Sequence, residues 1–149
     1  MTAPTITRYV KPTKGDAAFN AALAWLARHG VSVFGTRLLR VRGRRSGAIR
    51  TTVVNLLDVD GQRYLVAPRG VTQWVRNVRA AGEVELRVGR RAEHVAALEL
   101  ADADKSAVLR AYLKRWGWEV GRFFEGLDRN ATEEQLSAFA SSFPVFRLA

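Results

Sequence analysis

The stretch LLRVRGRRSGAIRTTVVN, residues 38–55, predicts two strands joined by an arginine-rich turn. Apolar and charged side chains alternate before the turn, in Leu39-Arg40-Val41-Arg42, and the apolar pattern resumes after it. A period of two is typical of strands with one buried face. The turn itself, residues 43–47, reads GRRSG. We therefore expect a hairpin with a cationic tip, and the rest of the chain is interpreted outward from it.

The turn has the composition of an anion site. Its two glycines allow positive-φ backbone conformations, which can direct N–H groups toward one point. Arg44, Arg45 and Arg50 can direct guanidinium groups to the same place, and the planar guanidinium matches a phosphate or a carboxylate with two parallel hydrogen bonds. A solvated basic hairpin tip is the alternative. GRRSG alone leaves both interpretations open.

Composition predicts one domain over residues 1–149, in which residues 1–14 are loose. With 149 residues and 48% hydrophobic content, the chain can close one sizeable core. It has no cysteine, its two histidines lie far apart, and Ser46 is not in a G-x-S-x-G motif. We therefore expect no metal site and no catalytic nucleophile, so an enzyme of this sequence would need a cofactor to carry the chemistry.

Charge is concentrated in the middle of the chain. The net charge is +10, and residues 37–91 hold thirteen arginines, no lysine and four acidic residues. This distribution indicates an anionic partner: a phosphorylated cofactor, a nucleic acid or an anionic lipid surface.

Strand patterns outnumber helical ones. Beyond the hairpin, strands are predicted at residues 53–59, 62–67, 84–88, 92–100 and 143–148. A short helix is expected at residues 72–81, an N-terminal helix at 16–29, and two C-terminal helices that open at Asp102 and at the capping box of Thr132. The fold class is therefore mainly β (α+β): a small antiparallel barrel with an N-terminal helix, one short inserted helix and C-terminal helices.

No stretch is long and apolar enough to span a membrane. The absence of cysteine fits a reducing compartment, so we expect a cytoplasmic protein. Residues 1–30 could still contact a membrane peripherally, because an apolar helix there is flanked by lysines.

Four segments, in order, carry a family resemblance: LRVRGRRSGAIRTT, YLVAPRG, QWVRNVRA and ELRVG. Together they resemble the deazaflavin-dependent nitroreductase family over residues 36–100, and the closing PVFRL is similar to the family's last strand. Members of that family are small split β-barrels, similar to flavin reductases, that use reduced 8-hydroxy-5-deazaflavin, coenzyme F-420, as hydride donor. The resemblance implies an oxidoreductase that reduces a planar acceptor such as a quinone, a nitroaromatic or an activated enone.

The resemblance also implies roles for individual residues. The turn and the strand after it would hold the phosphate and the acidic tail of the coenzyme, and the end of the following strand would pass along the ring. The W-x-x-N helix would add an apolar wall near the tail and a polar contact, with a core tryptophan beside a helix-end amide as the alternative. The residues so implied are Arg44, Arg45, Ser46, Gly47, Arg50, Thr51, Thr52, Ala67, Pro68, Arg69, Gly70, Trp74 and Asn77.

The acceptor pocket is less well marked. The loop of residues 69–74 is shorter than in the family's nitroreductases, and their substrate tyrosines are not recognisable here. We expect the C-terminal aromatics Tyr112, Trp116, Trp118 and Phe124 to line an apolar substrate pocket, with ordinary core packing as the alternative.

Two other functions remain in competition. The same barrel could bind flavin mononucleotide, or the basic face could bind nucleic acid, although the strands lack the alternating aromatic and basic residues of stacking platforms. The expected partner is a small-molecule acceptor, and the protein is expected to be a monomer or a homodimer.

Overall fold

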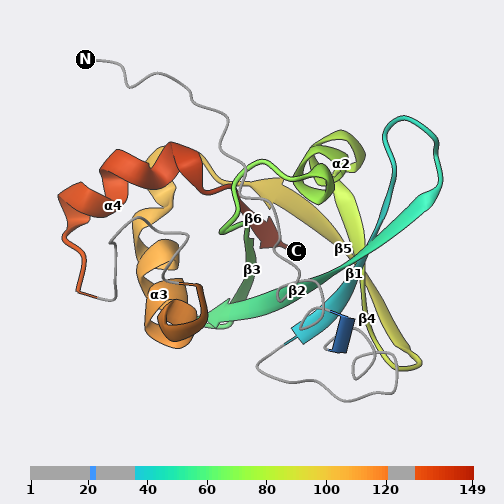
Figure 1. The fold of residues 1–149 in the computed structure, drawn as a ribbon, viewed down its shortest axis with the longest axis horizontal. Coiled ribbons are helices and arrows are strands. Elements are labelled where there is room, and N and C mark those ends of the chain that lie inside the picture. Colours follow the sequence, from blue (N-terminus) through green and yellow to red (C-terminus); the bar gives the residue numbers. More distant parts are fainter. Residues whose placement is uncertain (1–20, 23–35, 121–129) are drawn as a thin grey trace.

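The structure is a computed structural model that describes residues 21–22, 36–120 and 130–149. Six antiparallel strands close a barrel in the order β1-β2-β3-β6-β5-β4 (Figure 1). Their bounds are β1 Thr36–Arg42, β2 Ile49–Val59, β3 Gln62–Val66, β4 Glu83–Val88, β5 Arg91–Glu99 and β6 Val145–Leu148. The helices are α2 Gln73–Ala81, α3 Ser106–Val120 and α4 Glu133–Phe139, with short 3-10 turns at η1 Asp102–Asp104 and η3 Ala140–Ser142.

The barrel interior is filled by the alternate residues of each strand. Leu39 of β1, Leu65 of β3 and Phe146 of β6 are 0–1% exposed and belong to one apolar cluster. The register explains the arrangement, because directly paired antiparallel residues share a face and Leu65 pairs with Phe146. A slip of one residue would turn these side chains outward, so burial fixes the register.

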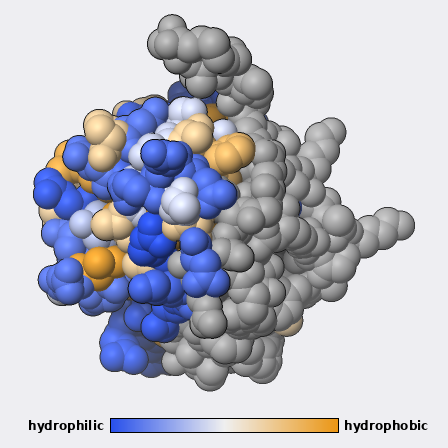
Figure 2. All heavy atoms as spheres, turned by 90° about the vertical axis from the view of Figure 1, so that its left-hand side faces the viewer, coloured by the Kyte–Doolittle hydropathy of each residue, from blue (hydrophilic) through white to orange (hydrophobic). Residues whose placement is uncertain are grey.

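The second apolar cluster lies between the outside of the barrel and the C-terminal helices. Leu57 of β2 and Val145 of β6 pack there against Leu109 of α3 and Leu136 of α4. In Figure 1 these two helices lie together on one side of the barrel. The outer face at that side is mainly hydrophilic over its described part, with apolar side chains scattered singly (Figure 2).

Helix α2 covers the barrel at the end where β3 stops and β4 begins. Thr72 caps it by accepting the N–H of Val75, and Gly82 ends it in the left-handed region at φ 73°. Its Val75 and Val78 are fully buried in the interior cluster. Arg79 adds two hydrogen bonds to the carboxylate of Glu99 at 2.8 and 2.7 Å, so this helix is fixed to both the core and β5.

The predicted fold class is confirmed: the strands form an antiparallel barrel with one inserted helix and C-terminal helices. The capping box at Thr132 and Gln135 is also present. One boundary is corrected, because Asp102 opens a single 3-10 turn and the α-helix begins at Ser106. The predicted N-terminal helix lies outside the described residues, except for helical Ala21 and Ala22.

Candidate functional site

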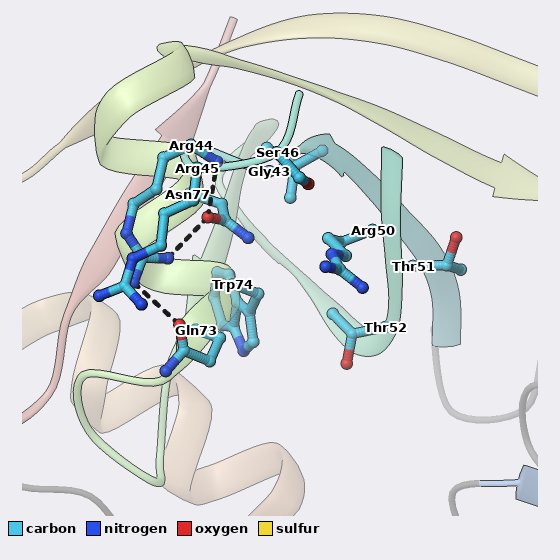
Figure 3. Close-up of a pocket in the computed structure, with 11 residues that line it drawn as sticks. Gly43, Arg44, Arg45, Ser46, Arg50, Thr51, Thr52, Gln73, Trp74 and Asn77 are labelled. Atoms are coloured by element: carbon cyan, nitrogen blue, oxygen red, sulfur yellow. Dashed lines mark hydrogen bonds between the residues drawn. The ribbon is translucent and has the colours of Figure 1, made fainter. Parts of the chain in front are cut away.

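A pocket of about 440 Å³ opens between the β1–β2 hairpin and helix α2. This volume is in the range of small-molecule sites. Figure 3 shows Arg50 and Thr52 of β2 on one side and α2 on the other, where Arg44 of the turn lies beside Asn77. The lining residues are Val41, Gly43, Arg44, Arg45, Ser46, Arg50, Thr51, Thr52, Gln73, Trp74 and Asn77.

One side of the pocket continues the inward-facing row of β2 beyond the packed core. Val54 in this row is 8% exposed, Thr52 is half-buried and Arg50 is exposed. Arg50 pairs with the buried Val41 and Thr52 with the buried Leu39, so both polar side chains lie on the interior face of the barrel. The row therefore becomes cationic where the core ends.

The turn is held by its own backbone. Gly43 donates its N–H to the carbonyl of Ala48 at 2.7 Å, and Gly47 donates to the carbonyl of Gly43 at 3.0 Å. Of the two glycines that allow positive φ in this turn, Gly47 takes it, at 75°, and Gly43 does not. Gly43 is required for space instead: an added Cβ would meet the Ala48 carbonyl oxygen at 3.0 Å and Ser46 Oγ at 3.3 Å.

Arg44 is tied to helix α2 through two neutral side chains. Its main-chain N–H and its Nη1 donate to Oδ1 of Asn77 at 3.2 and 2.8 Å, and its Nη2 donates to Oε1 of Gln73 at 2.9 Å (Figure 3). Asn77 is 4% exposed, which makes it a buried polar group whose oxygen is fully used. The turn and the helix are thereby joined at the pocket wall.

Electrostatics favour an anionic guest. Arg44, Arg45 and Arg50 line the pocket, and no acidic residue is among the described lining residues. Within the part of the chain that the structure describes, no hydrogen bond or ion pair to the side chain of Arg45 or Arg50 is found. Guanidinium groups without a carboxylate partner offer charge-assisted hydrogen bonds to phosphate or carboxylate oxygens.

Trp74 supplies an aromatic wall to this cationic pocket. The centroid of its ring lies 6.1 Å from the ring centroid of Phe146, with an angle of 50° between the ring planes, so Trp74 is supported from the barrel interior. In Figure 3 it faces Arg50 and Thr52 across the pocket. An apolar wall opposite hydrogen-bond donors is the usual construction of a site for an amphiphilic ligand.

The other residues implied by the resemblance do not line this pocket. Gly47 forms the turn. Ala67 is 1% exposed in the interior cluster, and Gly70 is buried at φ 88° with its N–H bonded to the Ala67 carbonyl at 3.1 Å. Pro68 and Arg69 are half-buried. This segment leads from β3 into α2, next to the pocket in the chain but outside its wall.

Of the four aromatics expected at the substrate pocket, Tyr112 is the one whose side chain the structure describes, and it lies away from this pocket. Tyr112 is 2% exposed and packs in the cluster between the barrel and the C-terminal helices, so it is a core residue there and the alternative of ordinary packing describes it. Trp116 and Trp118 lie on α3, but their side chains are outside the described residues, as is all of Phe124.

Sequence reasoning missed Gln73 and Val41, which also line the pocket. Gln73 lies four residues before Asn77 on α2, a spacing that places both on one helix face, and this signal could have identified it. Val41 was recognised only as a core residue. No cluster of potential metal ligands is found among the described residues, and no described helix is long and apolar enough to cross a membrane.

Residues 26–129 match the model of the family described as F420H(2)-dependent quinone reductase. No curated protein matches the chain significantly.

Solved structures share the fold at low sequence identity. A structure described as an F420-H2 dependent reductase, FDR-A, superposes with a TM-score of 0.54 at 18% identity, covering 77% of this chain and 94% of that one. A structure described as a domain-swapped dimer superposes with a TM-score of 0.57 at 17% identity, covering 92% of this chain and 100% of that one. The protein Atu2129 of Agrobacterium tumefaciens, of unknown function, superposes with a TM-score of 0.57 at 18% identity, covering 98% of this chain and 58% of that one.

At these identities the structural matches show the fold alone. The family model matches more than half of the chain, and it therefore shows the family. The chain therefore belongs to the F420H(2)-dependent quinone reductase family of oxidoreductases.

Proposed function

We propose that this protein binds reduced coenzyme F-420 with the anionic tail in the arginine-lined pocket, and that it reduces a planar, electron-poor acceptor such as a quinone, a nitroaromatic or an activated enone. The observation that carries the proposal is the donor set: three arginines line the pocket, and no carboxylate is among its described lining residues. Family membership supports the choice of coenzyme.

The coenzyme supplies a hydride when bound, and with one proton this completes the two-electron reduction of the acceptor, for example of a quinone to a hydroquinone. The protein supplies position and electrostatics. Arg45 and Arg50 offer guanidinium donors to the phosphate and carboxylates of the tail, and Arg44 is already oriented by α2. Ser46 accepts the N–H of Ala48 at 3.2 Å, which leaves its hydroxyl proton to donate.

The ring is proposed to extend beyond the pocket along the segment between β3 and α2, residues 67–70, and Trp74 is proposed as an apolar wall near the tail. Solvent or a nearby hydroxyl would supply the proton. Tyr112 of α3 has no part in this proposal, because it is packed in the cluster between the barrel and the C-terminal helices.

The test is a pair of fluorescence titrations with coenzyme F-420 and with flavin mononucleotide, followed by assay of reduced F-420 with menadione. We expect tighter binding of the deazaflavin and loss of reduced coenzyme only when menadione is present. Binding of flavin mononucleotide alone, or of neither compound, would overturn the proposal.

A cytoplasmic enzyme that touches membranes through residues 1–30 remains part of the proposal, since a lipid-soluble quinone could be met there. Sedimentation with liposomes of anionic and of neutral lipids, with and without those residues, tests it. Size-exclusion chromatography distinguishes a monomer from a homodimer.

A further inference from the structure

Arg44 donates hydrogen bonds to the oxygens of two amide side chains. Oδ1 of Asn77 accepts two hydrogen bonds from Arg44, and Oε1 of Gln73 accepts a third. A side-chain amide has its oxygen on one side and its NH2 group on the other. With the oxygen of Asn77 turned to Arg44, its nitrogen points away, toward the middle of the pocket (Figure 3).

Both side-chain partners of Arg44 are neutral, whereas three other described arginines are paired with carboxylates. Arg63 pairs with Glu93, Arg79 with Glu99 and Arg40 with Glu85. A carboxylate partner offsets the guanidinium charge, whereas an amide oxygen orients the guanidinium and leaves its charge available to a guest. At the pocket, therefore, the protein orients an arginine without neutralising it.

The two amides also fix the place of the turn. Gln73 and Asn77 lie four residues apart on α2, and Asn77 is anchored by burial at 4% exposure. Because Asn77 binds the main chain of Arg44 as well as its side chain, the hairpin tip and the guanidinium are held together. A donor held in place before binding loses less entropy when the ligand arrives.

We propose that Gln73 and Asn77 are positioning residues that hold Arg44 as a pre-oriented cation with an uncompensated charge, and that the NH2 group of Asn77 adds a neutral donor beside it. The pocket then selects a group whose oxygens only accept hydrogen bonds, as those of a phosphate ester do. In taking the coenzyme's phosphate as this group, the inference rests on the proposed function.

The test replaces one amide by a carboxylate. Gln73→Glu places a negative charge beside the Arg44 guanidinium. The control, Gln135→Glu, makes the same change on α4. There Oε1 of Gln135 accepts the Thr132 N–H at 2.8 Å, and a carboxylate keeps that bond. The probes are coenzyme F-420, its phosphate-free deazaflavin riboside and inorganic pyrophosphate. We expect Gln73→Glu to raise the Kd for F-420 about tenfold or more, since charge-assisted hydrogen bonds are lost.

The riboside separates positioning from general damage. Its Kd should stay within about twofold of wild type in Gln73→Glu, because it lacks the group that Arg44 binds. Gln73→Met removes the hydrogen bond without adding charge and should give an intermediate loss for F-420. The Kd for F-420 should also depend less on salt in Gln73→Glu than in the wild type, because one cation no longer contributes.

The outcomes distinguish the inference from the proposed function. Equal Kd values for F-420 in Gln73→Glu and Gln135→Glu, or an equal loss of riboside binding in Gln73→Glu, would overturn the inference and leave the proposed function intact. Pyrophosphate binding that Gln73→Glu abolishes, in a protein that does not bind F-420, would support the inference and overturn the proposed function. Binding of neither F-420 nor pyrophosphate to the wild type would overturn both.

Discussion

Val41 and Arg50 are cross-strand partners on the inward face of the barrel, yet Val41 is 3% exposed and Arg50 lies open at the pocket. The pair marks where the hydrophobic core stops and the candidate site begins. Since the strand register that buries Val41 also sets the direction of Arg50, one structural feature fixes both the core and the position of the cation.

The first prediction concerns the two arginines with no described partner. The double variant Arg45→Ala/Arg50→Ala should raise the Kd for F-420 by about a hundredfold or more, because each charge-assisted hydrogen bond contributes about 1.5–3 kcal/mol. Arg90→Ala/Arg91→Ala, at the exposed turn between β4 and β5, removes the same charge away from the pocket. Fluorescence titration of both double variants with F-420 tests the prediction. Equal affinities in the two variants would show that the turn does not form the binding site.

The second prediction concerns the glycine that the turn needs for space. Gly43→Ala forces a Cβ to 3.0 Å from the backbone oxygen of Ala48, which cannot rotate away. The hairpin must shift, and we expect a loss of about 1–3 kcal/mol in stability with weaker F-420 binding. Gly61→Ala, at φ 80° in the β2–β3 turn with open space around it, should cost about 1–2 kcal/mol through backbone strain alone.

Thermal unfolding and F-420 titration of both glycine variants separate the two causes. Gly61→Ala should bind the coenzyme like the wild type. If Gly43→Ala also bound it normally, the geometry of the turn would have no influence on the site.

Much of this architecture could be predicted from the sequence because the strands alternate cleanly. Leu39 and Val41 face inward as their period of two indicates, and Thr132 with Gln135 forms the capping box that its spacing predicts. These signals are local, involving neighbours a few residues apart. The antiparallel barrel then follows, since short strands with few intervening helices can bury their apolar faces by closing on one another.

What sequence reasoning could not give are contacts between distant segments. The Arg44–Asn77 hydrogen bonds join residues 33 positions apart, and nothing near GRRSG indicates that its first arginine is held by amides. Tyr112 shows the same limit for aromatics: a helical stripe is compatible with a core or a pocket, and only packing against Leu57 and its neighbours distinguishes them. The preference for glycine at position 43 is likewise set by a spatial neighbour, because an added Cβ would approach the Ala48 carbonyl oxygen across the turn.

The third prediction concerns pH. Arg63 binds Glu93 through two hydrogen bonds, one of them at 2.8 Å, and this holds the pKa of the Glu93 carboxyl below its ordinary value. A carboxyl with a lowered pKa in the folded state stabilises the protein above its unfolded pKa, and the stabilisation is lost as pH falls through the folded pKa. Because both side chains reach solvent, the effect should stay below about 1 kcal/mol.

Urea unfolding of wild type and Glu93→Gln at a series of acidic pH values measures this contribution. The two stabilities should differ at neutral pH and converge as pH falls, since the glutamine does not titrate. Glu83→Gln is the control, because Glu83 is exposed and no described ion pair involves it. A difference that is independent of pH would show that the ion pair does not stabilise the fold.

The last prediction concerns Lys105, a cation that is 3% exposed between η1 and η3. Its Nζ donates to the Ala140 carbonyl at 3.0 Å and lies 2.7 Å from Oδ1 of Asp102. Lys105→Met keeps the aliphatic stem but leaves the Ala140 carbonyl without this donor, so we expect a loss of about 1–3 kcal/mol. Asp102 is 57% exposed, and Asp102→Asn keeps an oxygen acceptor, so it should cost less than about 1 kcal/mol. Urea unfolding of the two variants tests the order: a larger cost for Asp102→Asn would mean that the ion pair, and not the hydrogen bond to the end of α4, holds the C-terminal segment in place.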